Sequence, residues 1–249
     1  MKFHKKDSAN MCEIEDKSVH LIITSPPYPM IKKWDEMFGI VNFDYQHKML
    51  KHSWEECVRV LCPGGIMCIN IGDATRSIGK WGFYCFPNYA RVAMDMWKFG
   101  MTPLIPIYWK KISNRPNAFL GSGFLPPNAY VSQDHEHIAI FRKGNLRKFR
   151  TKDPQRYASA FTKQERDLWF SQVWEIQGAK GAKETSSFPY EIPYRLIRMF
   201  SIIGDTVLDP FCGAGTVMRV AEENGRKGIG YDIIDYINKP IERKRRKYA

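Results

Sequence analysis

The amino-acid sequence predicts an α/β domain with a mostly parallel sheet. Short apolar runs, as in buried parallel strands, cover residues 19–24, 66–71, 104–109, 137–141, 205–209 and 227–232. Runs with apolar residues at helical spacing alternate with these, over residues 45–61, 89–99, 189–201 and 215–224. Alternation of this kind is typical of helices layered on a parallel sheet.

Turn residues mark the ends of the predicted elements. The first strand is closed by Pro26-Pro27, and the helix over residues 45–61 is stopped by Pro63-Gly64-Gly65. Prolines place the strand over residues 104–109 near an end or an edge of the sheet, because proline cannot donate to a strand ladder. The strand over residues 205–209 runs into a glycine-rich turn before the last helix.

Length and composition favour one domain. The chain has 249 residues, of which 44% are hydrophobic, enough for one sizeable core, so we expect a single domain over residues 1–249. Its six cysteines show no CxxC pair and no histidine spacing that suits zinc, which predicts reduced thiols and no metal site. There is neither an apolar leader nor a run of about 18 apolar residues, which predicts a cytoplasmic protein without membrane segments.

The chain is strongly basic. A formal net charge of +12 suits a polyanionic partner, but also an ordinary solvated basic surface. Basic groups that could hold phosphates and aromatic rings that could contact bases are densest over residues 142–166, which predicts an inserted target-recognition segment over residues 142–183. A surface loop packed by its own aromatics is the alternative. The candidate DNA-binding residues are Arg142, Lys143, Arg147, Lys148, Arg150, Lys152 and Arg156.

The turn after the first strand reads Thr24-Ser25-Pro26-Pro27-Tyr28. Its prolines carry no N–H and stiffen the loop, so that carbonyl oxygens point outward at little entropic cost. Ser25 Oγ and the Pro26 carbonyl can accept hydrogen bonds from the two N–H groups of an exocyclic amino group, and Tyr28 offers a ring for stacking on a flipped base. The same residues could form an ordinary tight turn.

A second turn follows residues 205–209 and reads Asp209-Pro210-Phe211-Cys212-Gly213-Ala214-Gly215-Thr216. Its glycines let the backbone come close to a ligand, and its N–H groups at a helix start can take an anionic group. The next strand ends in Asp232, about 20 residues further on, where an acid commonly binds ribose hydroxyls. A Gly-x-Gly turn by itself fits any nucleotide-binding loop, and both aspartates could be helix caps or turn formers.

Together, these two turns and three further segments resemble the β group of DNA amino-methyltransferases. The further segments are Val60-Leu61-Cys62-Pro63-Gly64-Gly65, the run that starts Asp134-His135-Glu136-His137, and the helix opened by Phe188-Pro189-Tyr190. The catalytic loop precedes the cofactor loop, which is the circularly permuted order of that group. The resemblance implies a Rossmann-like methyltransferase fold that binds S-adenosylmethionine (AdoMet), with a mostly parallel seven-stranded sheet that contains one antiparallel strand.

The resemblance also implies roles for individual residues. Ser25, Pro26, Pro27 and Tyr28 would form the catalytic loop that binds the target base, without a metal. The cofactor would be bound by Asp7, Thr24, Phe188, Asp209, Phe211, Cys212, Gly213, Gly215, Thr216 and Asp232. The sequence departs from the family at Glu184-Thr185-Ser186-Ser187, where a His-Pro pair is common, and at His137, where the family has an aromatic residue.

Serine at position 25 favours cytosine as the target, because the adenine enzymes more often carry aspartate there. The function implied is methyl transfer from AdoMet to cytosine N4 in duplex DNA, by base flipping and direct in-line transfer, and N6-adenine methylation is the alternative. Two other functions agree less well with the sequence. Glutamine methyltransferases of release factors carry Asn-Pro-Pro-Tyr, after their cofactor loop, so Ser25 and the permuted order argue against that function. A nucleic-acid-binding module without catalysis would not need both loops. Double-stranded DNA is the expected partner of a monomer or weak dimer, with a cognate restriction endonuclease as a further candidate.

Overall fold

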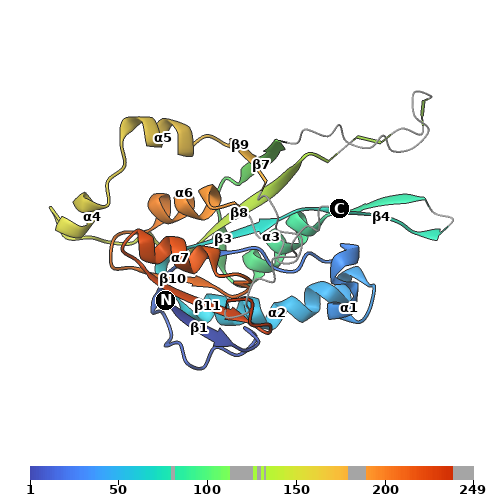
Figure 1. Ribbon diagram of the computed structural model, residues 1–249, viewed down its shortest axis with the longest axis horizontal. Coiled ribbons are helices and arrows are strands. Elements are labelled where there is room, and N and C mark those ends of the chain that lie inside the picture. Colours follow the sequence, from blue (N-terminus) through green and yellow to red (C-terminus); the bar gives the residue numbers. More distant parts are fainter. Residues whose placement is uncertain (80–81, 113–125, 128–129, 132, 179–188, 238–249) are drawn as a thin grey trace, which may run out of the picture.

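The computed structural model describes residues 1–79, 82–112, 126–127, 130–131, 133–178 and 189–237. The strands of its main sheet are β1 (Lys2–Lys5), β2 (Val19–Thr24), β3 (Leu61–Ile71), β6 (Met101–Pro103), β7 (Ile107–Ile112), β8 (His135–Lys143), β9 (Val173–Gln177), β10 (Thr206–Asp209) and β11 (Lys227–Asp232). They lie in the order β1-β11-β10-β2-β3-β8-β7-β9, with β6 paired to β8 (Figure 1). Strands β4 (Ala74–Ser77) and β5 (Phe83–Phe86) form a separate hairpin.

The main sheet is mostly parallel, as expected. Within the described residues, β8 runs antiparallel to its neighbours β3, β6 and β7, and the remaining strand pairs of this sheet are parallel. The sheet has nine strands rather than the seven expected. The sequence patterns missed β1, β6 and β9, because β6 has three residues and the other two are edge strands that lack a continuous buried run.

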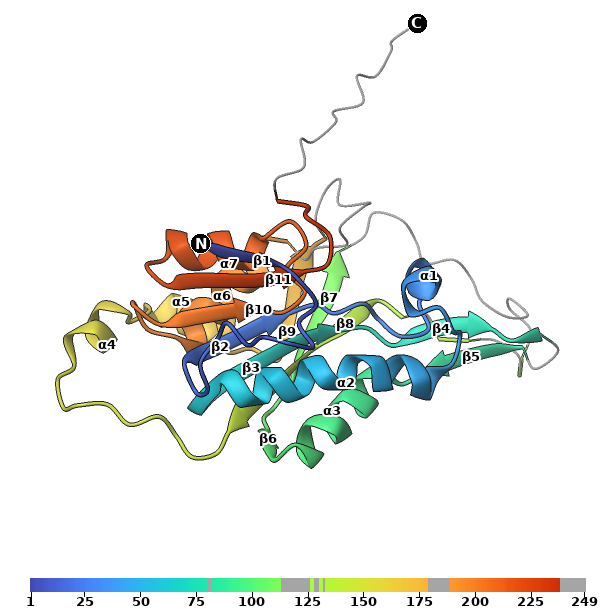
Figure 2. The same cartoon turned by 90° about the horizontal axis from the view of Figure 1, so that it is seen from below.

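Helices cover both faces of this sheet. They are the 3-10 turn η1 (Lys32–Trp34), α1 (Asp35–Phe38), α2 (Phe43–Val60), α3 (Asn88–Lys98), α4 (Pro154–Ala158), α5 (Lys163–Trp169), α6 (Glu191–Phe200) and α7 (Thr216–Glu223). Helices α2 and α3 lie on one face (Figure 2), where Trp54, Val92 and Ile69 belong to one buried cluster. Helices α6 and α7 cover the other face, where Leu196 and Val217 belong to a second cluster. The four helices predicted from periodicity are confirmed, with ends shifted by one or two residues.

The predicted recognition segment, residues 142–183, is partly built into the sheet. It begins with the last two residues of β8, continues through α4 and α5, and includes β9, which pairs in parallel with β7. Trp169 and Trp174 are buried against the rest of the domain, and residues 179–183 lie outside the described residues. In Figure 1, α4 and the β4–β5 hairpin mark opposite ends of the molecule.

Candidate active site

The predicted catalytic loop and the predicted cofactor loop lie side by side at one edge of the sheet. Because β2, β10 and β11 are parallel neighbours, their carboxyl ends, Thr24, Asp209 and Asp232, meet at this edge. A hydrogen bond of 2.7 Å from Thr24 Oγ1 to Asp209 Oδ1 joins the two loops across 185 residues of sequence. Ligands of open α/β sheets bind at this edge, so the structure brings the two halves of the predicted site together.

Glycines and one carboxylate shape the cofactor loop. Gly213 and Gly215 have φ angles of +48° and +75°, which residues with a Cβ rarely adopt. Asp232 Oδ2 accepts a 2.9 Å hydrogen bond from Gly213 N, and its Oδ1 accepts one of 2.9 Å from Ile234 N. The carboxylate at the end of β11 therefore holds the turn between β10 and α7, and each of its oxygens keeps acceptor capacity for a ligand.

Small residues let β11 come close to this loop and to the start of α7. A Cβ added at Gly230 would lie 2.8 Å from Cys212 Cβ, and one at Gly228 would lie 2.6 Å from Met218 O. Cys212 is buried, and burial raises the pKa of its thiol. We conclude that Cys212 packs the loop, whereas Thr216 begins α7 and is only half-buried at the ligand edge.

Asp209 holds the end of β10. Burial raises its pKa to about 7, although Thr24 Oγ1 and the Phe211 N–H, at 3.1 Å, both donate to its Oδ1 and act in the opposite direction. The Phe211 ring packs edge-on against Trp54, with ring centroids 5.7 Å apart. Asp209 thus ties the two loops together from beneath, and Phe211 fixes the turn against the core.

The catalytic loop rests on polar residues that sequence reasoning did not assign to the site. The Tyr28 hydroxyl donates to Glu136 Oε2 at 2.9 Å, accepts from Asn70 Nδ2 at 2.7 Å, and lies 3.0 Å from Ser25 Oγ. Asn70 Nδ2 also donates to Glu136 Oε2 at 2.7 Å, and Lys111 Nζ is ion-paired with Glu136 Oε1. The available signal was a buried amide, Asn70, within the apolar run over residues 66–71.

A buried amide clamps the backbone behind the catalytic loop. Asn88 Nδ2 donates to Pro29 O at 2.9 Å and to Gly72 O at 3.0 Å, which joins the loops that follow β2 and β3. His47 Nε2 lies 3.0 Å from Asn88 Oδ1. Since an amide oxygen can only accept, Nε2 carries the proton, and burial lowers the pKa of His47 to about 4. A neutral histidine therefore holds the clamp.

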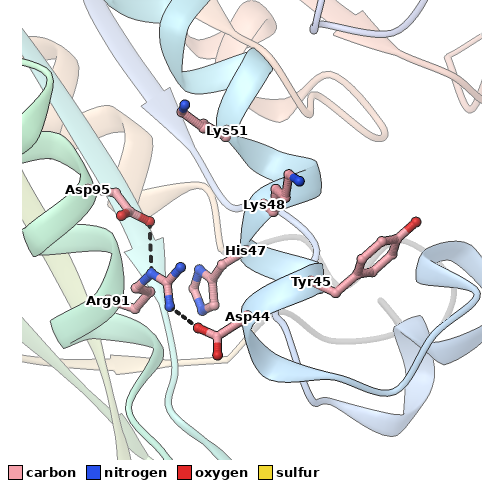
Figure 3. Close-up of a pocket in the computed structure, with 7 residues that line it drawn as sticks. All are labelled: Asp44, Tyr45, His47, Lys48, Lys51, Arg91 and Asp95. Atoms are coloured by element: carbon pink, nitrogen blue, oxygen red, sulfur yellow. Dashed lines mark hydrogen bonds and ion pairs between the residues drawn. The ribbon is translucent and has the colours of Figure 1, made fainter.

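A surface pocket between α2 and α3 shares His47 with this clamp (Figure 3). It is lined by Asp44, Tyr45, His47, Lys48, Lys51, Arg91 and Asp95. Arg91 is ion-paired with both Asp44 and Asp95, so these charges satisfy one another. No residue of the two predicted loops lines this pocket, and we place the chemistry at the sheet edge instead.

Two predicted cofactor residues, Asp7 and Phe188, lie outside the two loops. Asp7 follows β1, which pairs with β11, and Lys6 N donates to Asp232 O at 3.0 Å, so Asp7 lies near the end of β11. Its side chain is exposed, and its Oδ1 accepts from Ala9 N at 2.8 Å. Phe188 lies outside the described residues.

The basic residues at the end of β8 stand at the opposite edge of the sheet from the catalytic loop. Arg142 pairs with Ile66 of β3, whereas the catalytic edge of β3 is at Ile71, about 16 Å further along the strand. Lys143 Nζ donates to Leu61 O at 2.7 Å, which caps the end of α2. Arg142 and Lys143 therefore have structural roles, in the β3–β8 ladder and at the end of α2, that do not require DNA.

Of the other predicted DNA-binding residues, Arg147 pairs with a buried carboxylate and the remaining four are exposed. Arg147 makes a bidentate pair with buried Asp205, with one bond at 2.8 Å, and its guanidinium stacks on Phe149. Exposed side chains are found at Lys148, Arg150, Lys152 and Arg156. DNA contact by this segment stays a prediction.

Within the described parts of the chain, no group of three or more side chains could hold a metal ion. In the same residues, no helix is long and apolar enough to cross a membrane.

Comparison with known proteins assigns the family. The N6/N4 methyltransferase model, described as DNA methylase, matches residues 19–243. The chain belongs to this family. It is 54% identical to the Type II methyltransferase M.MjaI of Methanocaldococcus jannaschii, over 96% of this chain and 88% of the relative. The Type II methyltransferase M.MthZI of Methanothermobacter thermautotrophicus is 44% identical to this methylase, over 92% and 71% of the two chains.

Solved structures confirm the Rossmann-like methyltransferase fold. TTHA0409 of Thermus thermophilus, in complex with AdoMet, aligns with a TM-score of 0.77 at 30% identity, over 94% of this methylase and 88% of that chain. The cytosine-N4-specific PvuII DNA methyltransferase aligns with a TM-score of 0.67 at 20% identity, over 93% and 81% of the two chains, which supports the fold. This methylase is therefore an AdoMet-dependent DNA amino-methyltransferase.

The cofactor loop of this methylase fits AdoMet. The positive φ angles of Gly213 and Gly215 open the turn, and the backbone there leads into the amino end of α7, where an anionic carboxylate is stabilised. Asp232 presents acceptor oxygens beside it. When bound, AdoMet supplies an electrophilic methyl group on a sulfonium sulfur.

Proposed function

We propose that this methylase transfers the methyl group of AdoMet to the exocyclic N4 of cytosine in duplex DNA. The observation that carries the proposal is Ser25, a neutral hydroxyl 3.0 Å from the Tyr28 hydroxyl, which in turn donates to Glu136. An aspartate at position 25 would place a second carboxylate beside the same tyrosine proton, and like charges that share a site disfavour ionisation of both. The network therefore suits the neutral residue that is associated with cytosine enzymes.

The loop provides acceptors for the amino group. The nitrogen lone pair of this group is delocalised into the base, which makes it a poor nucleophile. Ser25 Oγ and the Pro26 carbonyl accept hydrogen bonds from its two N–H groups and stabilise the positive charge that develops on nitrogen during attack. Pro27 stiffens the loop, and the Tyr28 ring packs on the base. The base must leave the duplex first, because the reacting atom is otherwise inside the helix.

The cofactor is held from the other side of the same edge. Asp232 accepts hydrogen bonds from the ribose hydroxyls, and the amino end of α7 at Thr216 takes the methionine carboxylate. Gly213 and Gly215 shape the turn that leads to it, because their N–H groups already donate to Asp232 Oδ2 and Cys212 O. Thr24 and Asp209 hold this loop against the catalytic loop through their 2.7 Å hydrogen bond. The reacting nitrogen and the methyl group thus meet between two loops that one buried contact keeps in register.

Duplex DNA is the partner in this proposal. The net charge of +12 favours association with phosphates, and the relatives M.MjaI and M.MthZI are named as Type II methyltransferases. We accordingly propose that this methylase protects a short DNA site from a cognate restriction endonuclease.

The proposal is tested by identifying the modified base. Purified protein is incubated with plasmid DNA and AdoMet, the DNA is digested to nucleosides, and the products are separated and identified by mass. The expected product is N4-methyl-2′-deoxycytidine. Deoxyadenosine methylated at N6 as the sole product would overturn the cytosine assignment and leave the family, fold and cofactor unchanged.

A further inference from the structure

We propose that Glu136 and Asn70 are positioning residues that set the direction of the Ser25 hydrogen bond, so that Ser25 meets the target amino group purely as an acceptor. The inference rests on the proposed role of the catalytic loop, but it does not depend on which base is methylated. Glu136 and Asn70 come from neighbouring strands, β8 and β3, and meet beneath that loop.

The direction of the hydrogen bond between Ser25 and Tyr28 follows from the number of protons that each hydroxyl can donate. The Tyr28 hydroxyl has one proton, and Glu136 Oε2, 2.9 Å away, is a carboxylate oxygen that can only accept it. Asn70 Nδ2 occupies a lone pair of the tyrosine oxygen from 2.7 Å. The 3.0 Å contact between Ser25 Oγ and Tyr28 Oη is then satisfied when Ser25 donates. Its own lone pairs are left for the amino group.

The surroundings of Glu136 hold this arrangement. Lys111 pairs with Oε1, while Oε2 accepts hydrogen bonds from both Tyr28 and Asn70. Burial and the negative charge of Glu136 raise the pKa of Tyr28, so its hydroxyl keeps the proton that it donates. The chain of donors therefore runs from Ser25 through Tyr28 to a fixed acceptor.

Asn70 provides a second argument that this cluster serves function. Its side chain is 3% exposed, and its Oδ1 has no hydrogen-bond partner among the described residues. An unsatisfied buried carbonyl destabilises a fold, whereas an apolar residue would fill this strand position without that cost. The amide is explained by its two donor contacts, to Tyr28 Oη and Glu136 Oε2.

The first test replaces the acceptor by an amide. In Glu136→Gln the new N–H₂ can donate to Tyr28, whose proton then turns toward Ser25 and occupies its lone pair. We expect kcat for tritiated methyl transfer into plasmid DNA to fall on the order of 10- to 100-fold. AdoMet affinity, measured by calorimetry, should be unchanged. The matched control is Glu175→Gln, which removes a carboxylate from the neighbouring Lys110 ion pair at the same end of the sheet and should keep wild-type kcat.

The second test asks whether Glu136 acts through the tyrosine hydroxyl. Tyr28→Phe keeps the ring and removes the relay, so adding Glu136→Gln to it should cause no further fall in kcat. An equal fall of kcat in both backgrounds would overturn the inference, as would wild-type kcat in Glu136→Gln. Loss of AdoMet binding in that variant would show a purely structural role and would also overturn it. Failure of the cytosine assignment is recognised separately, because the assay counts methyl groups on either base.

Discussion

Replacing Asp232 tests how the cofactor site is built. Its two oxygens accept 2.9 Å hydrogen bonds from Gly213 N and Ile234 N, and we propose that they also accept from the AdoMet ribose. Asp232→Ala removes the ribose contacts and the anchor of the glycine turn together. Hydrogen bonds to a charged group contribute about 1.5–3 kcal/mol, so the Kd for AdoMet should rise roughly 10- to 150-fold.

Titration calorimetry with AdoMet measures this Kd directly. Asp232→Asn is the informative second variant, because its amide places an N–H₂ against one of two backbone N–H donors and should also weaken binding. Asp153→Ala is the control, since Asp153 caps α4 through a 3.1 Å bond from Arg156 N and lies away from the sheet edge. Wild-type affinity in a normally folded Asp232→Ala protein would refute the assignment of the ribose to this carboxylate.

Three further results are expected. Ser25→Asp should abolish most cytosine methylation in the nucleoside assay, because it adds a second carboxylate beside the Tyr28 hydroxyl, which already donates to Glu136. Retained activity would contradict this. Arg147→Ala should lower the free energy of unfolding by about 1–3 kcal/mol in urea, because it leaves the buried Asp205 carboxylate without its bidentate partner, and an unchanged midpoint would count against the pair. His47, with its pKa lowered from 6.5 to about 4, stabilises the fold fully above pH 6.5 and loses this contribution as pH falls toward 4, by at most about 1.4 kcal/mol per pH unit. Relative to wild type, His47→Gln should lose that dependence in unfolding curves taken between pH 4 and 7, whereas identical slopes would exclude the burial of His47 as its source.

The sequence was sufficient to predict those parts of the fold that have strong local patterns. Buried parallel strands such as β2 and β10 read as continuous apolar runs, and proline and glycine turns marked their ends. Edge strands lack such a run: in β9, buried and exposed residues alternate, and β1 has no buried residue, so neither could be recognised. The strand count was low for this reason and because β6 has only three residues.

The candidate site divides in the same way. Contiguous residues could be proposed from the sequence: Ser25 to Tyr28 and the glycine turn are each one stretch of sequence, and the resemblance to a family implies their roles. Glu136 and Asn70 were missed because their role depends on β3 and β8 being antiparallel neighbours, which no local pattern encodes. Counting charges in residues 142–166 likewise could not show that Arg147 would be used by Asp205, 58 residues away.

The central claim is that methyl transfer occurs at the loop formed by Ser25 and its neighbours. AdoMet with a deuterated methyl group, incubated with DNA and the wild-type protein, should place the label on cytosine N4, as identified by mass after digestion to nucleosides. The folded double variant Ser25→Ala with Tyr28→Ala should bind AdoMet with wild-type affinity and transfer almost no label. Full transfer by that double variant would contradict the mechanism.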